Sequence, residues 1–462
     1  MISHTGSSRT ITRPDTAAGP RAVPRLAHNG PVNAFAPTGP TDPRDPSSPS
    51  SPSSPSDPSG AADPLTDPLA AFTALRTPEG TALLAELRSY DPAQELATAT
   101  RLRRSHPAAL VSAALGQARL RQRAVAKFGA EDAYRMFFTP NGVEQATRTS
   151  VATYRAGRFA AADVRSVADL CCGIGGDAIA LARAGISVLA VDRDPLTAEV
   201  ARANAAALGL DALIEVRCAD VTEIDTAAYD AVFVDPARRG GRGRIFDPEA
   251  YSPPLSWATG AALKAPRAAL KIAPGIPHEA VPAQAEAEWI SDGGDVKEAV
   301  LWFGEGFAAG SYRATLLPAG ATLSAPAALP APPVGPVGRY LYEPDGAVIR
   351  AHLVAGIVDR SGGRLIDETI AYVTSDEPYD SPYTSAYEIT DRLPFNMKKL
   401  KALLRERKVG VLTVKKRGSA VEPEELRRKM KLQGPNAATV FLTRVAGAPT
   451  MLIGHPVRPE MS

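Results

Sequence analysis

The stretch VADLCCGIGGD at residues 167–177 decides the fold of this chain. Apolar residues lead up to Asp169, which we expect to end a β-strand. Three glycines follow in a predicted tight turn: Gly173, Gly175 and Gly176. Asp177 comes next, where we expect it to cap the start of a helix. Glycine has no Cβ and lets the backbone approach a ligand closely. A strand, a glycine-rich turn and a helix in this order are typical of nucleotide-binding units in α/β folds.

The sequence around this stretch repeats the same alternation. Short apolar, β-branched runs follow at SVLAVD, IEVRCAD, AVFVDP, ALKIAPG and AVLWFG, between residues 187 and 304, and Ala-rich stretches of helical character separate the first of them. Strands that alternate with helices indicate βαβ units and a parallel sheet. We therefore predict an α/β fold for this part of the chain.

Acidic residues follow the first three predicted strands. Asp192 lies 23 residues after Asp169, where a carboxylate can accept both hydroxyls of a ribose, and Asp220 ends the third strand. A carboxylate at the entrance of the glycine loop would repel a pyrophosphate but attract the cationic methionine end of S-adenosylmethionine (SAM). The pattern thus favours SAM over a dinucleotide. Any one of these acids taken alone can also be a helix cap or a solvated turn residue.

These motifs, in this order and spacing across residues 136–325, resemble class I SAM-dependent methyltransferases. The resemblance implies a Rossmann-like sheet with SAM as cofactor. It also implies that the loop from Asp169 to Gly176 holds the methionine part, Asp192 the ribose and Asp220 the adenine amino group. The candidate cofactor residues are Asp169, Cys171, Gly173, Gly175, Gly176, Asp177, Asp192 and Asp220. Cys171 stands where the family most often has glycine.

The fourth predicted strand leads into Asp235-Pro236-Ala237-Arg238-Arg239. This resembles the Asp/Asn-Pro-Pro-aromatic motif of methyltransferases that act on amino groups of bases. The resemblance implies that Asp235 and the carbonyl after it accept hydrogen bonds from the target amine, and we take Asp235 and Pro236 as the candidate catalytic residues. Ala237 replaces the second proline and Arg238 the aromatic residue, so a stacking ring must come from elsewhere; the candidates are Phe246, Tyr251, Trp257, Phe137 and Phe138. Asp235 can alternatively cap a turn.

Four arginines follow in a glycine-containing loop, and they can grip phosphates or simply be solvated: Arg238, Arg239, Arg242 and Arg244. A second basic segment lies between Lys398 and Lys431, where 13 Lys and Arg face 4 Glu, a local net charge of +9. Such density suits a polyanion, although basic faces are often only solvated helices.

The stretch from Tyr340 to Val457 resembles the THUMP-like domain that follows bacterial methyltransferase domains, here of actinobacterial type. THUMP domains bind RNA in RNA-modifying enzymes, so the resemblance implies an RNA partner. Lys415, Lys416 and Arg417 are the candidate phosphate contacts.

We expect five segments along the chain. They are a disordered low-complexity tail at 1–62, a helical domain at 63–135, the methyltransferase domain at 136–325, a Pro-rich linker at 326–338 and the THUMP-like domain at 339–458. The linker belongs to a wider Pro/Ala/Gly-rich segment from Leu317 to Gly338. In the helical domain, apolar residues recur at helical spacing, as in Leu83, Leu84 and Leu87 and again in Leu110, Val111 and Leu115.

Global composition is less informative. The formal net charge is only +2, and three cysteines cannot form a disulfide framework and lack metal-ligand spacing. Without a long apolar run we expect a cytoplasmic protein with no membrane and no metal partner; its oligomeric state stays open. The leading hypothesis is a SAM-dependent methyltransferase that modifies a base nitrogen in tRNA or rRNA. The alternatives are an enzyme of the same fold acting on a small molecule or protein, and a non-catalytic RNA-binding protein with a vestigial SAM pocket.

Overall fold

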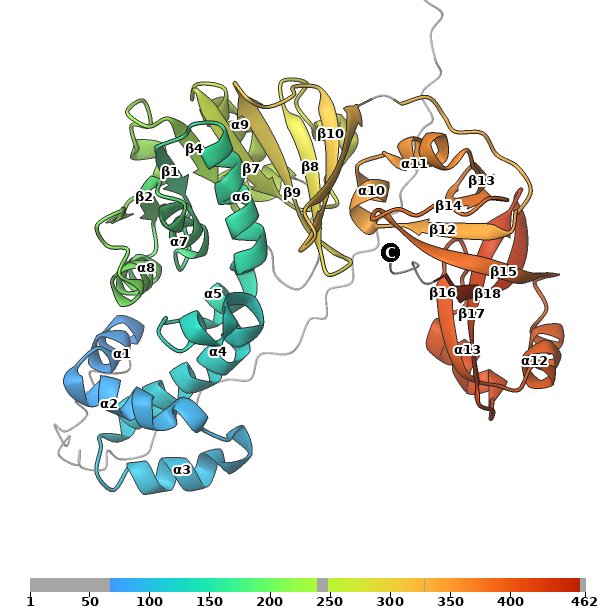
Figure 1. The fold of residues 1–462 in the computed structure, drawn as a ribbon. Coiled ribbons are helices and arrows are strands. Elements are labelled where there is room, and N and C mark those ends of the chain that lie inside the picture. Colours follow the sequence, from blue (N-terminus) through green and yellow to red (C-terminus); the bar gives the residue numbers. More distant parts are fainter. Residues whose placement is uncertain (1–66, 239–247, 328, 458–462) are drawn as a thin grey trace, which may run out of the picture. The chain divides into compact units, whose positions relative to one another are not determined.

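The computed structural model describes residues 67–238, 248–327 and 329–457 (Figure 1). The expected tail at 1–62 lies outside the described residues. So do Arg239, Arg242, Arg244 and Phe246, together with the side chain of Arg238.

The first part of the described chain is helical, as the spacing predicted. Its helices are α1 (Pro68–Leu75), α2 (Pro78–Glu86), α3 (Glu95–Leu102) and α4 (Ala108–Ala133). Asp67 and Thr77 cap α1 and α2 through their side-chain oxygens, and proline occupies the first turn of both helices. The six apolar residues named for this segment are all buried in one cluster: Leu83, Leu84, Leu87, Leu110, Val111 and Leu115. Two further helices, α5 (Pro140–Gln145) and α6 (Thr149–Ala161), lead into the sheet.

A nine-stranded sheet forms the centre of the next part. Its strands are β1 (Ser166–Leu170), β2 (Ser187–Asp192), β3 (Ile214–Cys218), β4 (Ala231–Val234), β7 (Arg267–Ile272), β8 (Glu286–Asp292), β9 (Asp295–Gly304), β10 (Ser311–Leu317) and β11 (Ala321–Pro326). The strand order is β11-β10-β8-β9-β7-β4-β1-β2-β3. The pairs β3-β2, β2-β1, β1-β4 and β4-β7 are parallel, whereas β9 runs antiparallel to both β7 and β8.

The strand order reverses direction between β1 and β4, because the chain first adds β2 and β3 on one side and then β4 on the other. Open α/β sheets bind ligands at the carboxyl ends of their strands at such a switch point. The glycine loop follows β1 and Asp235 follows β4, so the fold brings both to this position.

Helices cover the two faces of this sheet. On one face α6, α7 (Gly176–Arg183) and α8 (Pro195–Leu208) pack against alternate strand residues such as Val167 and Phe233. On the other face α9 (Leu255–Ala262) packs against Ala168 and Leu170. Both faces of the central strands are buried, which explains their nearly continuous apolar sequences.

Three details differ from the sequence predictions. Gly175, at a positive φ of 85°, is the N-cap of α7, whereas Asp177 lies inside its first turn. The Pro/Ala/Gly-rich segment expected to be linker from Leu317 onward first forms strand β11, which pairs antiparallel with β10. Strands β8 and β10 lie outside the strand runs predicted from the sequence. A short separate hairpin, β5 (Ala237–Arg238) with β6 (Tyr251–Ser252), follows Asp235.

A second sheet of seven strands forms the C-terminal module. Its strands are β12 (Tyr340–Pro344), β13 (Arg364–Asp367), β14 (Ile370–Ser375), β15 (Thr384–Pro394), β16 (Val409–Lys416), β17 (Asn436–Val445) and β18 (Ala448–Pro456). The order is β13-β14-β12-β15-β18-β17-β16, antiparallel except for β16 with β17. Its helices are α10 (Gly346–Arg350), α11 (Val354–Ser361), α12 (Met397–Glu406) and α13 (Pro423–Met430). The α/β fold class, with helices before and a mixed module after the main sheet, is confirmed.

Within the described residues, no helix is both long and apolar enough to cross a membrane.

Candidate active site

A cavity of about 1170 Å³ opens at the carboxyl ends of the central strands. The loop after β1, the ends of β2 and β4, and Lys271 and Ile272 of β7 line it on the sheet side. The segment from Thr139 to Val151, which includes α5, lines it from the helical side. Of the predicted site residues in the methyltransferase region, the cavity brings together Cys171, Gly173, Gly176, Asp177, Asp192, Asp235 and Pro236.

The glycine loop has the backbone conformation that its composition predicts. Gly173 and Gly175 have φ values of 56° and 85°, in the left-handed region that favours glycine. A Cβ at Gly173 would meet no atom within 4 Å, so this position borders open space in the cavity. Cys171 also has a positive φ, of 69°, which is unfavourable for a residue with a side chain. Its replacement of the family's usual glycine is therefore accompanied by local backbone strain.

Asp169 does not lie where the sequence placed it. It is inside β1, fully buried, and both carboxylate oxygens lack a hydrogen-bond partner in the described part of the chain. Burial raises the pKa of Asp169 well above its ordinary value, and the charges of Asp177 and Asp235 raise it further. Both effects favour the uncharged acid. Arg155 and Lys271 oppose this shift. Asp169 does not line the cavity, where Asp177 and Asp192 are the carboxylates that flank the loop, and its part in cofactor binding stays a prediction.

Asp192 and Asp220 have different surroundings. Asp192 accepts hydrogen bonds from the backbone N–H groups of Gly173 (3.1 Å) and Asp194 (3.0 Å), one on each oxygen. A carboxylate has about four acceptor positions, so Asp192 keeps capacity for a ligand on both oxygens. Burial raises its pKa above the usual range. Asp220 instead caps the short turn after β3 by accepting from Thr222, and it does not line the cavity.

Asp235 is held by a lysine that the sequence reading missed. Lys271 Nζ lies 2.5 Å from Asp235 Oδ2 and donates a second hydrogen bond to Thr147 Oγ1 at 2.8 Å. Burial lowers the pKa of Lys271, but Asp235, Glu298 and Asp177 raise it by more, so the ammonium stays charged. Among the described residues, Oδ1 of Asp235 makes no hydrogen bond, and the side chain is 30% exposed. One oxygen of Asp235 is thus fixed while the other is free to accept a donor from the cavity.

A buried ion-pair network supports this arrangement. Arg155 of α6, whose side chain is 2% exposed, binds Asp177 of α7 and Glu298 of β9, and its guanidinium lies over the ring of Phe233 at 4.7 Å. Burial lowers the pKa of Arg155, but the two carboxylates raise it above the ordinary value. The network therefore fixes the first turn of α7, directly after the glycine loop, against the sheet.

The candidate stacking rings are widely distributed. Tyr251 lines the cavity but is only 5% exposed. Trp257 lies on α9 and Phe138 is buried in the core, and neither lines the cavity. Phe137 lines a different cavity. Tyr251 is thus the described aromatic candidate that the fold places at the site.

The cysteines are free thiols rather than metal ligands or disulfides. Burial raises the pKa of both the Cys171 and the Cys172 thiol, and the nearby aspartates add to the shift. Thiols with raised pKa values are poor nucleophiles, which favours a packing role for Cys171 and Cys172 over a catalytic one. Among the described residues, no group of His, Cys, Asp or Glu side chains could hold a metal ion.

The candidate phosphate contacts of the C-terminal module are already engaged. Lys415 binds Glu343 and lies over Tyr387, Lys416 binds Glu422, and Arg417 lies over Tyr372. Other cations of the same segment are exposed and form no salt bridge among the described residues: Lys398, Lys399, Arg405, Lys408, Arg428 and Lys431. Several of them lie on α12 and α13, whose apolar residues Leu400, Leu404, Leu426 and Met430 pack on the sheet.

The fold and this site define a class of protein. A parallel sheet with a glycine loop at its switch point, free backbone space at Gly173, and a carboxylate with spare acceptors after β2 fit the methionine and ribose parts of SAM. The chain is a class I SAM-dependent methyltransferase.

Comparison with known proteins gives the family. Residues 167–237 match the family described as a methyltransferase domain, residues 384–456 match the THUMP domain-like family, and residues 67–124 match a domain of unknown function. Two relatives, each named as an uncharacterized S-adenosylmethionine-dependent methyltransferase, come from Mycobacterium tuberculosis strains H37Rv and CDC 1551. Each is 34% identical over 355 residues, which cover 74% of this chain and 95% of the relative. The chain belongs to this family of SAM-dependent methyltransferases.

The fold also matches a solved structure over most of its length. The crystal structure of a protein assigned as a methyltransferase from Porphyromonas gingivalis W83 superposes with a TM-score of 0.65. The match covers 80% of this chain and all of that chain at 21% identity. At that identity the likeness concerns the fold alone.

Proposed function

We propose that this methyltransferase modifies a base nitrogen in RNA, either tRNA or rRNA. The observation that carries the proposal is the state of Asp235: Lys271 fixes one carboxylate oxygen, and the other faces a cavity that also contains the glycine loop. A free, oriented acceptor at this position suits a target N–H group. The THUMP-like match and the unpaired cations of α12 and α13 support RNA as the molecule that carries the amine.

In this proposal Asp235 Oδ1 and the backbone carbonyl of Pro236 accept the hydrogens of the target amine, so that its lone pair points into the cavity. Lys271 and Thr147 hold the Asp235 carboxylate in place, and its preset orientation is what favours reaction. SAM, when bound, supplies an activated methyl group. Asp192 holds its ribose, and the backbone of the loop from Cys171 to Gly176 lies against its methionine part, with Asp177 beside the positive charge.

The proposed division of labour follows the expected segments, with methyl transfer in residues 136–325 and RNA binding in residues 339–458. The three free cysteines fit a reducing compartment, and we propose that the protein acts in the cytoplasm.

The test compares modified nucleosides in RNA from cells with and without the protein by mass spectrometry, then repeats the transfer in vitro with labelled SAM. Asp235→Ala should abolish transfer to RNA while calorimetry still detects SAM binding. The matched control is Asp225→Ala, an exposed aspartate that does not line the cavity and bonds only its own turn. Full transfer by Asp235→Ala would refute the role of this carboxylate.

A triple variant tests the RNA part of the proposal. Replacing Lys398, Lys399 and Arg405 by Gln should reduce transfer to RNA and leave SAM affinity intact. If transfer to RNA is absent in the wild type but a small molecule or protein is methylated, the substrate assignment is wrong. If nothing is methylated although RNA binds, the non-catalytic alternative is correct.

A further inference from the structure

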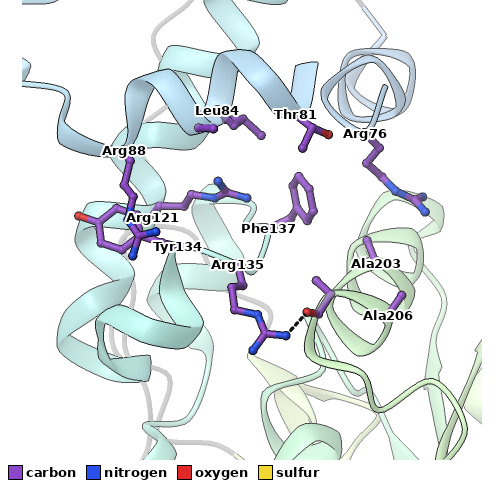
Figure 2. A pocket seen from close by; sticks show the side chains of 12 residues that line it. Arg76, Thr81, Leu84, Arg88, Arg121, Tyr134, Arg135, Phe137, Ala203 and Ala206 are labelled. Carbon is purple, nitrogen blue, oxygen red and sulfur yellow. Dashed lines mark hydrogen bonds between the residues drawn. The ribbon is translucent and has the colours of Figure 1, made fainter. Parts of the chain in front are cut away.

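A second cavity, of about 660 Å³, lies between the N-terminal helices and α8 (Figure 2). Four arginines line it: Arg76, Arg88, Arg121 and Arg135. No acidic residue is among the described residues that line it. Its volume is in the range of ordinary ligand pockets, and its charge is strongly one-sided.

Arg121 is the least ordinary of these residues. It is only 8% exposed, its Nε donates to the Met136 carbonyl at 2.9 Å, and its guanidinium lies over the Phe137 ring at 5.1 Å. Within the described residues its two Nη groups have no hydrogen-bond partner, yet they are not sealed from solvent, so they face the cavity (Figure 2). Burial lowers the pKa of Arg121 to about 10, because the cation has no anion beside it.

The neighbouring arginines add to this excess of positive charge. Arg88 lies over the Tyr134 ring at 5.2 Å, and Arg135 donates to the carbonyl of Ala207 at 2.6 Å. Neither has a carboxylate partner among the described residues, whereas Arg76 binds Glu199. Three arginines without a carboxylate partner among the described residues thus line one cavity. Arg121 is the buried one, and a bound anion would offset the cost of burying its charge.

The chemistry of the lining selects phosphate rather than a stacked base. Guanidinium groups present paired N–H donors that match phosphate oxygens in a bidentate manner. The faces of Tyr134 and Phe137 already carry guanidinium groups, so the rings are occupied as cation–π partners.

The position of the cavity points to a polymer. Phe137 lines this cavity and Thr139 lines the candidate active site. Two residues of chain span at most about 7 Å. A nucleotide strand that places a base in the active site can therefore bring its backbone to the arginines. The helical segment that forms this wall includes the match to a domain of unknown function at residues 67–124.

We propose that this arginine cavity binds a backbone phosphate of the RNA substrate; the RNA part of this inference rests on the proposed function. The experiment measures binding of a fluorescein-labelled single-stranded RNA oligonucleotide to the full chain by anisotropy over a range of salt concentrations. The test variant is the double substitution Arg88→Gln with Arg135→Gln, because both side chains are exposed and their loss should not unfold the chain. The matched control is Arg104→Gln, an exposed arginine of the same helical region that does not line the cavity.

The double variant should bind RNA about tenfold more weakly, and the slope of log K against log salt should fall by roughly 0.7, the contribution of one single-strand phosphate contact. SAM affinity and the Arg104→Gln control should be unchanged. Wild-type affinity and slope in the double variant would overturn the proposal, even if the wild type methylates RNA normally. If the double variant shows the expected loss of RNA affinity and salt dependence but the wild type methylates no RNA, the phosphate site is supported and the proposed function is refuted.

Inorganic phosphate distinguishes the two sources of the anion. Inorganic phosphate is added at a concentration equal to that of the RNA phosphates. The resulting increase in melting temperature should be no larger for the wild type than for the double variant. If inorganic phosphate protects the wild type selectively and as strongly as RNA does, the cavity serves a free anion, and its assignment to RNA is overturned.

Discussion

Replacement of Lys271 by Met tests whether the pair with Asp235 holds the candidate catalytic carboxylate. The change removes a 2.5 Å ion pair and the 2.8 Å hydrogen bond to Thr147, and it leaves Asp235 without a partner. Removing one partner of a buried pair costs about 3–5 kcal/mol. Because the Asp235 side chain is 30% exposed, water can resolvate it, and we expect a loss of about 2–3 kcal/mol.

The pairwise part of this loss can be isolated with a double-mutant cycle. Asp235→Ala leaves the more enclosed lysine, whose side chain is 12% exposed, without its anion and should cost about 3 kcal/mol. The double variant buries no unpaired charge, so it should lose at least about 2 kcal/mol less than the sum of the two single variants. Lys297→Met is the matched control, because Lys297 also lines the cavity but pairs with an 82% exposed Asp295; its loss should be below about 1 kcal/mol.

The assay is urea denaturation followed by tryptophan fluorescence. All three tryptophans report on this region, because Trp257 lies on α9 and Trp289 and Trp302 lie on β8 and β9 of the same sheet. Lys271→Met should also reduce methyl transfer while SAM affinity is retained. Strict additivity of the two single losses would refute the reasoning, since it would mean that the pair contributes nothing as a unit.

Three further predictions follow from the same structure. Arg155→Met leaves the carboxylates of Asp177 and Glu298 unpaired and should cost about 3–5 kcal/mol, or a melting temperature lower by roughly 10 °C in calorimetry; an unchanged melting temperature would contradict the ion-pair network. Cys171→Gly removes the strain of a positive φ of 69°, which should stabilise the fold by about 1–2 kcal/mol. The greater backbone entropy of glycine in the unfolded chain should cost about 0.5–1 kcal/mol. Urea denaturation should therefore show an equal or slightly higher free energy of unfolding, and a lower one would contradict the strain. Burial lowers the pKa of Lys127 from 10.5 to about 8, so between pH 8 and pH 10.5 the unfolded chain binds more protons than the folded chain. The free energy of unfolding of the wild type should therefore rise across this pH range relative to that of Lys127→Met. Melting temperatures that change with pH in parallel in the two proteins would exclude this shift.

The repeating local pattern made much of the fold predictable. Each of the six strand runs quoted from the sequence forms a strand, and their order along the chain sets the parallel part of the sheet. Strand β8 escaped this reading because Glu286 and Glu288 alternate with Ala287 and Trp289, and buried glutamates are rare without partners. The partners come from α6, where Arg158 binds both glutamates across about 130 residues of sequence.

At the candidate site, too, contacts between residues far apart in the sequence could not be predicted from local patterns. Proximity of Gly173 and Asp235 follows from the switch point of a parallel sheet, so the sequence could predict it. The partners of Asp235 could not be predicted in this way. The remaining signal was a lysine within the apolar strand ALKI, which is unusual in a central strand and could have marked Lys271 as a residue with a buried carboxylate partner.

By itself, the sequence of this protein determined most of the strands and helices and the glycine loop, and its resemblance to a known family indicated the cofactor class. The strands, helices and loop depend on periodicities of 2 and about 3.6 residues and on glycine conformations, which act between near neighbours in the chain. Tertiary structure alone decided that Asp169 is buried and unpartnered, that Lys271 fixes Asp235, and that three arginines without carboxylate partners meet beside α8. Charge effects depend on distance in space and on burial, and packing of the sheet and helices sets both.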